Sequence, residues 1–459
     1  MWRLRTPSLL LAICAIAVAA CGDAALERAD GGAADGWDAG ADPVDAGGDP
    51  GAAADGDGSA DAGQADDGET GCAGAPLDQQ ARGSVAVGDW LEDVPLAPCS
   101  LHRYALVAPA GSVLSLEIGA APGSGDVELA VGFADADGFE QALLRMPAVG
   151  QQPTRRSFGV PRSGEFAVLV RAVDPAAAAA YHLGVECALE CDRQASRYPI
   201  VLVHGWTGWD EVGSYTYFFG VADHLTAKGF LVYTASLDPY NSVEVRSQQL
   251  AEQIDGFLAA GRAERVNLIA HSQGGLDARR AISSLGYAEK VASLITISAP
   301  HRGTPIADVA LGLMPGFAED ILAWFLEWLG ATVVGSESDA IASFASITTA
   351  YVQDEFNPAN PDAEGVTYIS YAGRTCPLGL TCGDMCDIEI QFAYYILLAI
   401  AGANDGMVPV DSAMWGDWRG EIPADHFDEI GQLAGITGPN FDHREFYLDL
   451  ARDLAAEGF

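Results

Sequence analysis

The sequence predicts an α/β domain built on a mostly parallel sheet, preceded by a small all-β domain and a polar tether. From residue 198 onward, apolar segments of strand length alternate with helical patterns, as in parallel sheets that helices cover on both faces. Residues 72–191 instead contain short alternating stretches broken by Gly, Pro and Asp, which is typical of β-sandwiches. Residues 21–71 consist mostly of Gly, Ala and Asp.

The size and charge of the chain limit its function. Its 459 residues suffice for two or three domains, and 49% of them are hydrophobic, so a large core can form. The formal net charge of −40 argues against nucleic acid as a partner, because nucleic-acid binding needs a cationic face. It also disfavours tight electrostatic docking on anionic lipid.

The N-terminus has the features of a targeting segment. Residues 1–20 contain Arg3, Arg5 and an apolar run too short to span a bilayer with ease. The run ends in Val-Ala-Ala-Cys at 18–21, which resembles a bacterial lipobox. The resemblance implies cleavage before Cys21, lipidation of Cys21, and an exported lipoprotein of the outer membrane or cell surface. The alternative is an ordinary secretory signal in which Cys21 is incidental. Residues 21–71 are then expected to be a disordered tether, since they cannot bury enough apolar surface to fold.

Seven cysteines remain after Cys14 and Cys21 are set aside. Export favours disulfides, and the odd number leaves at least one thiol free or paired between chains. The last three, Cys376, Cys382 and Cys386, lack a Cys-x-x-Cys pair and a nearby histidine. A disulfide in a loop is therefore expected there in preference to a zinc site.

Residues 72–191 are expected to form an accessory β-sandwich, with strands near 103–107, 113–118 and 166–170. The run Ser-Gly-Glu-Phe at 163–166 resembles the strand-turn signature of jelly-roll-like domains appended to secreted bacterial peptidases. That resemblance implies a role in binding a ligand or in spacing the catalytic domain.

The α/β pattern beyond residue 198 predicts these elements. Strands are expected at 199–203, 230–235, 265–270, 291–298 and 366–371. Helices are expected at 215–228, 243–260, 275–285 and 441–455.

The most informative motif is Val-Asn-Leu-Ile-Ala-His-Ser-Gln-Gly-Gly-Leu at 266–276. An apolar strand leads directly into Ser272, small residues flank it, and a helical pattern follows. A nucleophile elbow needs this arrangement, because a tight strand-to-helix turn presents the hydroxyl at a helix N-terminus. The alternative is a serine that merely caps a helix after a buried strand.

A serine nucleophile needs a histidine base and an orienting carboxylate. In α/β-hydrolases the carboxylate comes after the serine in the chain, and the histidine comes after the carboxylate. His426, in a late loop, is the preferred base. His443 opens the terminal helix, and His301 is expected to organise a loop. Asp405 is the preferred acid because Gly406 permits a sharp turn after an apolar stretch, and Asp411 is its rival.

Two backbone N–H groups must stabilise the oxyanion. We expect one from Gln273, the residue after Ser272. We expect the other from Trp206, which follows Val-His-Gly at 203–205, directly after the first strand of the domain.

Residues 198–459 resemble the true lipases of Pseudomonas and Burkholderia, which are α/β-hydrolases. The resemblance rests on the motifs at 198–205, 266–276, 300–304, 404–408 and 426–432. It implies hydrolysis of triacylglycerol or other carboxylic esters through an acyl-enzyme on Ser272, and it suggests a folding chaperone as a partner. Ala270 departs from the family's first glycine in the pentapeptide.

The same resemblance implies a structural Ca²⁺ that holds the loop bearing His426. Its ligands would be the carboxylates of Asp384 and Asp428, the amide oxygen of Gln432 and the backbone carbonyl of Ile436. All are oxygen ligands, as Ca²⁺ requires. The alternative is that both acids are solvated loop residues.

A lid is expected within about residues 305–345. Residues 318–329 place large apolar side chains around most of one helix, more than a narrow buried stripe needs. We therefore expect a mobile cover over an acyl groove. The alternative functions are a short-chain or polyester-type esterase, a soluble acyltransferase, or a catalytically silent surface binding protein.

Overall fold

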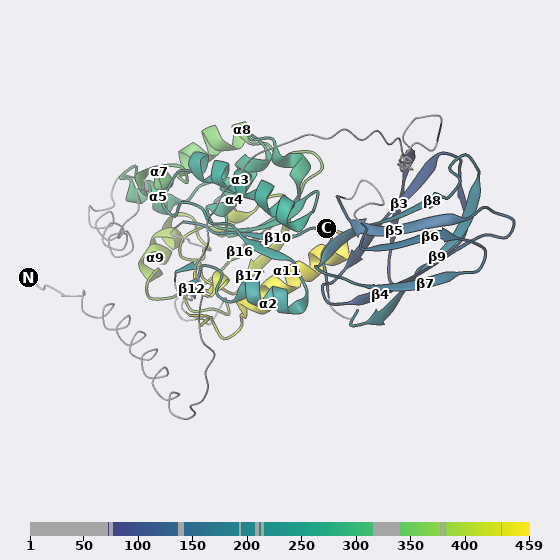
Figure 1. Cartoon of the computed structure of the whole chain (residues 1–459). Helices are drawn as coiled ribbons and strands as arrows, with labels where there is room; N and C mark the ends of the chain where they lie inside the picture. Colours follow the sequence, from purple (N-terminus) through teal and green to yellow (C-terminus); the bar gives the residue numbers. More distant parts are fainter. Residues whose placement is uncertain are drawn as a thin grey trace, which may run out of the picture. The chain divides into compact units, whose positions relative to one another are not determined.

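The computed structural model describes residues 72, 77–135, 142–191, 194–206, 211–212, 215–314, 340–376, 379, 382–432 and 434–459 (Figure 1). The predicted signal peptide, the lipidation site Cys21, the tether and the apolar segment 318–329 lie outside the described residues. Within the described part of the chain, no helix is both long enough and apolar enough to span a membrane.

The first folded part is all-β, as predicted. One sheet has the order β1-β3-β8-β5-β6 and the other the order β2-β9-β4-β7. The predicted strands at 103–107, 113–118 and 166–170 fall in β3, β4 and β8. The strands are β1 Asp78–Val85, β2 Trp90–Leu96, β3 Ser100–Ala108, β4 Val113–Ala120, β5 Val127–Phe133, β6 Leu144–Val149, β7 Thr154–Gly159, β8 Gly164–Ala172 and β9 Ala179–Leu189.

The second part contains a parallel six-stranded sheet of order β13-β10-β14-β15-β16-β17. Its strands are β10 Ile200–Val203, β13 Val232–Thr234, β14 Val266–His271, β15 Val291–Ile297, β16 Thr367–Gly373 and β17 Asp417–Ile422. Every residue of β10, β14 and β15 is buried, which explains their mostly apolar sequences. A short hairpin of β11 Glu211–Val212 and β12 Tyr215–Thr216 stands apart from this sheet.

Helices cover both faces of this sheet. Side chains of α2 and α11 pack with Ile200, Leu202 and Ile269, whereas those of α3 and α4 pack with Val201 and Leu268. Because successive strand residues point to opposite faces, these pairs of helices lie on opposite sides. The helical segments are α2 Val221–Lys228, α3 Val243–Gly261, α4 Gly274–Ile282, η1 Tyr287–Lys290, α5 Pro305–Ala310, α7 Ala340–Ala345, η2 Tyr351–Phe356, α8 Asn357–Ala359, α9 Gln391–Ile400, α10 Val410–Ala413, η3 Asp428–Ile430 and α11 His443–Glu457.

Two predictions about these elements were wrong. The helix expected from residue 215 begins only at Val221, because Tyr215–Thr216 pairs with Glu211–Val212 as a strand and Gly220 takes a left-handed conformation before the helix. Strand β17 was missed, because its sequence Asp-Trp-Arg-Gly-Glu-Ile is polar and half exposed at the sheet edge.

Among the described residues, three disulfides join Cys72 to Cys99, Cys187 to Cys191, and Cys376 to Cys382. The third confirms a disulfide in the loop where a zinc site was considered. Cys386 is the free cysteine of the described part and is buried. Burial, followed by nearby carboxylates, raises the pKa of its thiol, so it is a poor nucleophile.

Candidate active site

Ser272 lies at the turn between β14 and α4. Its φ of 56° is in the left-handed region, which non-glycine residues rarely adopt outside strained turns. The turn is possible because Gly274 closely approaches the end of the neighbouring strand β10. A Cβ on Gly274 would lie 2.7 Å from the carbonyl oxygen of Val203. The turn at Ser272 therefore has the strained strand-to-helix geometry of a nucleophile elbow.

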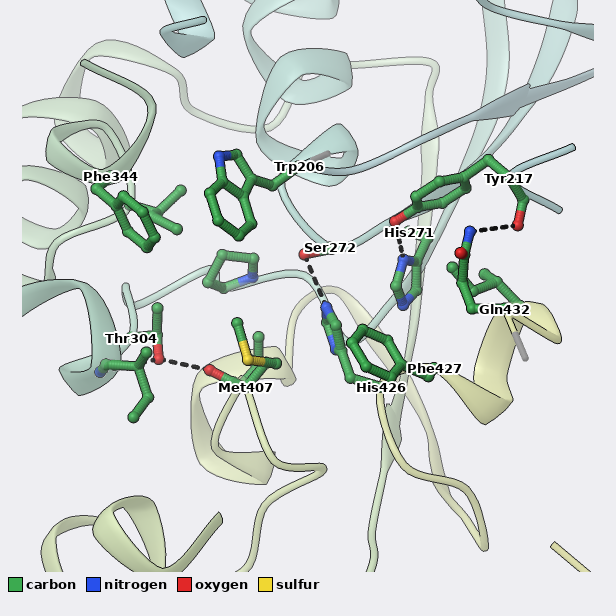
Figure 2. A pocket seen from close by; sticks show the side chains of 15 residues that line it. Trp206, Tyr217, His271, Ser272, Thr304, Phe344, Met407, His426, Phe427 and Gln432 are labelled. Atoms are coloured by element: carbon green, nitrogen blue, oxygen red, sulfur yellow. Dashed lines mark hydrogen bonds between the residues drawn. The ribbon is translucent and has the colours of Figure 1, made fainter. Parts of the chain in front are cut away.

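The structure brings Ser272, His426 and Asp405 together. His426 Nε2 lies 3.0 Å from Ser272 Oγ, and His426 Nδ1 lies 2.7 Å from Asp405 Oδ2. The other carboxylate oxygen of Asp405 accepts hydrogen bonds from the backbone N–H groups of Met407 and Val408, at 2.8 and 2.6 Å. Asp405 is therefore fixed on one side by the backbone and orients the imidazole on the other. Figure 2 shows the His426 ring directed at Ser272.

The rival residues have other partners. His443 Nε2 bonds to the carbonyl of Phe219 at 2.8 Å. His301 Nε2 lies 3.0 Å from the Thr296 hydroxyl, and its ring stacks on Trp415. Asp411 is exposed in α10. Each of the three is thus held away from the Ser272 hydroxyl or open to solvent.

Gln273, one predicted oxyanion donor, immediately precedes α4. Its backbone N–H has no hydrogen-bond acceptor among the described residues. Its side chain is fixed by Asn241 and Ser343, at 3.1 and 2.8 Å. A backbone N–H at a helix N-terminus stabilises negative charge, so Gln273 is suited to this role.

Trp206, the other predicted donor, follows β10 in a loop whose backbone is held by the buried Arg246 of α3. Arg246 Nη2 donates to the carbonyls of His204 and Gly205, at 2.7 and 3.2 Å, and Nε donates to Asp277 at 2.8 Å. The sequence analysis missed Arg246, because a single arginine in an amphipathic helix gives no signal that it points inward.

A buried polar network lies next to His426, whose ring centroid is 4.5 Å from that of His271. His271 Nδ1 is 2.7 Å from the Tyr217 hydroxyl, and Nε2 is 2.7 Å from Glu429 Oε2. Burial lowers the pKa of His271 well below its ordinary value, and burial followed by the charge of Asp405 raises that of Glu429 well above. Both shifts favour the neutral forms, in which the Glu429 carboxyl group donates its proton to His271 Nε2. The sequence analysis did not identify Glu429.

A cavity of about 180 Å³ lies against Ser272 and His426 (Figure 2). Its lining is mostly apolar and includes Trp206, Ile306, Phe344, Ile347, Met407 and Phe427. An apolar pocket with a few convergent polar groups is the usual form of a small-molecule site. This one has the character needed to take an acyl chain.

A cluster of buried acids lies close to the His426 loop. Asp384, Asp425 and Asp428 each place an oxygen within 4.8 Å of the others. Neither carboxylate oxygen of Asp384 has a hydrogen-bond partner in the described structure. Burial, with the charges of Asp384 and Asp387, raises the pKa of Asp428 to about 7. Backbone N–H groups donate to Asp425 and Asp428, so Asp384 is the carboxylate left without donors, and its hard oxygen atoms beside two further acids fit a divalent cation such as Ca²⁺.

The structure brings together only part of the predicted calcium set. Asp384 and Asp428 lie together, and Asp425, which was not predicted, joins them. The side chain of Gln432 instead lines the apolar cavity and donates from Nε2 to the Tyr217 carbonyl at 3.0 Å. The predicted ligand at Ile436 is its backbone carbonyl, and its side chain is 72% exposed.

The model for proteins of the alpha/beta hydrolase fold matches residues 198–430. A triacylglycerol lipase of Vibrio cholerae is 32% identical over 263 residues, which covers 52% of this chain and 82% of the relative. This chain belongs to the α/β-hydrolase family. Another relative of this α/β-hydrolase is a triacylglycerol lipase of Burkholderia plantarii, 30% identical over 302 residues, covering 54% of the chain and 82% of the relative.

Solved structures similar to this α/β-hydrolase include the mature lipase BlEst2 of Bacillus licheniformis. It is 20% identical with a TM-score of 0.44, over 57% of this chain and 94% of the other. A metagenomic carboxyl esterase is 17% identical with a TM-score of 0.47, and the match covers 59% of this chain and 79% of the esterase. The sequence relatives and the family together identify the protein as a carboxylic ester hydrolase of the lipase and esterase type.

Proposed function

We propose that this α/β-hydrolase is a triacylglycerol lipase that acts through an acyl-enzyme on Ser272. The observation that carries the proposal is the hydrogen-bonded series Ser272–His426–Asp405, which lies against an apolar cavity. Relatives named triacylglycerol lipase at about 30% identity support the choice of substrate.

In the first half-reaction, Ser272 Oγ attacks the ester carbonyl carbon while its proton passes to His426 Nε2. Negative charge develops on the carbonyl oxygen, where the N–H groups of Trp206 and Gln273 stabilise it. Asp405 stabilises the imidazolium. His426 then gives its proton to the alcohol oxygen, the carbon–oxygen bond of the ester breaks, and the diacylglycerol leaves.

In the second half-reaction, water attacks the acyl carbon and gives a proton to His426. The tetrahedral intermediate collapses, the bond to Ser272 Oγ breaks, and His426 returns the proton to that oxygen. A fatty acid and the free enzyme result, so atoms and charges balance over the cycle.

Apolar side chains on α9 favour an ester presented at a lipid surface over a dissolved one. Phe392, Tyr395 and Leu398 are 49%, 50% and 44% exposed on one side of this helix. The other side of α9 carries Tyr394, which packs in a cluster with Met407 and Phe427 of the cavity lining. Exposed apolar patches mark binding surfaces, and this one adjoins the catalytic cavity.

We also propose that Asp384, Asp425 and Asp428 hold Ca²⁺. Bound there, the cation would neutralise three buried carboxylates and fix the segment between Asp425 and Asp428, which includes His426. It would take no part in the bond-breaking steps.

The proposal extends to localisation: export, cleavage before Cys21 and lipid anchoring through it. Palmitate labelling in a bacterial host would test this, with label lost in Cys21→Ser. We further propose a folding chaperone, in line with the lipase resemblance. Recovery of active enzyme from urea by dilution alone would contradict this last part.

A fluorophosphonate probe combined with two substrates tests the function. Labelling at Ser272 with cleavage of emulsified triglyceride in preference to a soluble short ester supports a lipase. Cleavage of the soluble ester or a polyester alone would assign an esterase. Transfer of the acyl group to added alcohol as the main product would assign an acyltransferase. The absence of labelling would favour a binding protein.

A further inference from the structure

The outer face of the sheet β2-β9-β4-β7 carries an aromatic side chain that the catalytic function does not use. Trp90, at the start of β2, is 45% exposed. It is opposite Gly184 of β9, a residue that is itself buried. Figure 1 shows β9, β4 and β7 in this part of the chain.

The indole lies flat on the sheet over Gly184. A Cβ on Gly184 would come within 2.2 Å of the six-membered ring of Trp90, so only glycine leaves room for the ring. The neighbouring His182 lies in the same way over Gly119 of β4, where a Cβ would come within 2.3 Å of the imidazole. The two rings are nearly parallel, with an interplanar angle of 23° and centroids 5.8 Å apart. Two glycines therefore make space for a nearly flat platform.

Charged groups lie beside the platform in the same register. Glu117 of β4 is opposite Gly184, and Arg155 of β7 is opposite Glu117. Arg155 donates to Glu117 at 2.8 Å and to Glu186 at 2.6 Å. Trp90, Gly184, Glu117 and Arg155 thus form one row across four strands, which begins with an aromatic face and ends with fixed donors and acceptors.

We propose that this row is a carbohydrate-binding site for a β-1,4-linked pyranose polymer. The axial C–H groups of a pyranose with equatorial substituents form a flat face that stacks on the electron-rich face of an indole. The ring hydroxyls would then exchange hydrogen bonds with the carboxylates and guanidinium at the end of the row.

The surroundings favour a sugar over lipid or a protein partner. Trp90 is followed along the row by charged residues, whereas lipid contact needs a contiguous apolar patch. A stable protein interface needs about 800 Å² per partner with an apolar centre. A small aromatic platform of Trp90 and His182 beside hydrogen-bonding side chains instead matches the alternating apolar faces and hydroxyls of a polysaccharide.

Sedimentation of the exported chain with insoluble polymers tests the site. We expect the chain to sediment with cellulose or with chitin. Binding to cellulose would identify a glucose polymer as the ligand, and binding to chitin a polymer of N-acetylglucosamine. Trp90→Ala should weaken binding at least about tenfold, Trp90→Tyr should keep part of it, and Arg155→Gln should weaken it less than Trp90→Ala. Val173→Ala, at a residue of the same domain that is 46% exposed, is the matched control and should bind normally. Hydrolysis of a soluble ester should be the same in all variants.

A soluble hexasaccharide of the retained polymer should displace the wild-type chain, a result that requires no variant. The proposal is overturned if neither polymer retains the wild type, if Trp90→Ala binds equally well, if the hexasaccharide fails to displace it, or if gelatin beads retain the chain to the same extent.

Discussion

Arg246 donates a hydrogen bond to the backbone carbonyl of Gly205, with 3.2 Å between Nη2 and the oxygen. In a trans peptide the N–H points opposite to the C=O. The Trp206 N–H, which shares this peptide, is therefore directed away from Arg246. Gly205 packs against Ser272, where a Cβ on Gly205 would come within 2.7 Å of the Ser272 Cβ. Arg246 therefore orients, next to Ser272, the peptide whose N–H we propose as an oxyanion donor.

We expect Arg246→Lys to lower kcat by roughly 10- to 100-fold, less than the 10²–10³ typical of losing an oxyanion donor. KM should change little, because the affected interaction forms only in the transition state. The lysine keeps a positive charge beside Asp277, which limits the loss of stability. Steady-state kinetics on a soluble ester measure the effect, and Arg280→Lys on α4 is the control. Equal kcat values for the two variants would contradict the positioning role.

We expect Asp405→Asn to lower kcat by on the order of 10⁴-fold, because an amide at this position stabilises the wrong imidazole tautomer. Asp411→Asn should leave kcat unchanged, since Asp411 is an exposed residue of α10. Active-site titration corrects both values for the fraction of folded enzyme. A larger loss for Asp411→Asn would reassign the acid.

Removal of calcium should destabilise the protein. We expect excess EGTA to lower Tm by on the order of 5 °C and added Ca²⁺ to restore it, because a ligand that binds only the folded state stabilises that state. Asp384→Asn should have a Tm that no longer responds to EGTA. Asp449→Asn, at an exposed acid of α11, should respond as the wild type does. An unchanged wild-type Tm in EGTA would rule out the cation site.

The exposed side of α9 should affect emulsified and dissolved substrates differently. We expect the double substitution Phe392→Ser, Leu398→Ser to reduce hydrolysis of emulsified triglyceride at least about tenfold and that of a soluble short ester less than twofold. Val245→Ser, at another exposed helical position, controls for general surface polarity. Equal losses on both substrates would contradict a role in contact with lipid.

Acid should destabilise the fold through His204. Its Nε2 accepts a hydrogen bond from the Leu237 N–H at 2.9 Å, so the ring must be neutral, and burial lowers its pKa from 6.5 to about 3. As pH falls, the unfolded chain binds a proton at His204 before the folded chain does. The contribution of His204 to the free energy of unfolding is therefore complete above pH 6.5 and decreases as pH drops toward 3.

Urea unfolding of the wild type and His204→Asn measures this contribution. The stability advantage of the wild type should shrink by about 2 kcal/mol between pH 7 and pH 5. An advantage that stays constant over this range would show that His204 titrates equally in both states.

The sequence predicted the elements whose signals are local. The elbow around Ser272 requires small residues at fixed positions. The buried strands β10, β14 and β15 have mostly apolar sequences. The Asp405 turn is marked by Gly406, whose φ of 98° excludes most other residues.

The sequence did not reveal features that depend on distant contacts. Strand β17 is polar at the sheet edge, so no apolar run marks it. Arg246 and Glu429 are charged residue types that are mostly exposed in proteins, and their burial is explained by partners distant in sequence, such as Asp277 and His271. Asp425 joins Asp384 across 41 positions of sequence, a pairing that no spacing rule supplies.

Titration of fatty acid released from emulsified long-chain triglyceride, with calcium present, tests the central claim most directly. The wild type should release fatty acid steadily, and Ser272→Ala should release none above the rate of spontaneous hydrolysis. Release by Ser272→Ala at a rate near that of the wild type, or no release by a wild type that still cleaves a soluble ester, would contradict the assignment of this chain as a serine triacylglycerol lipase.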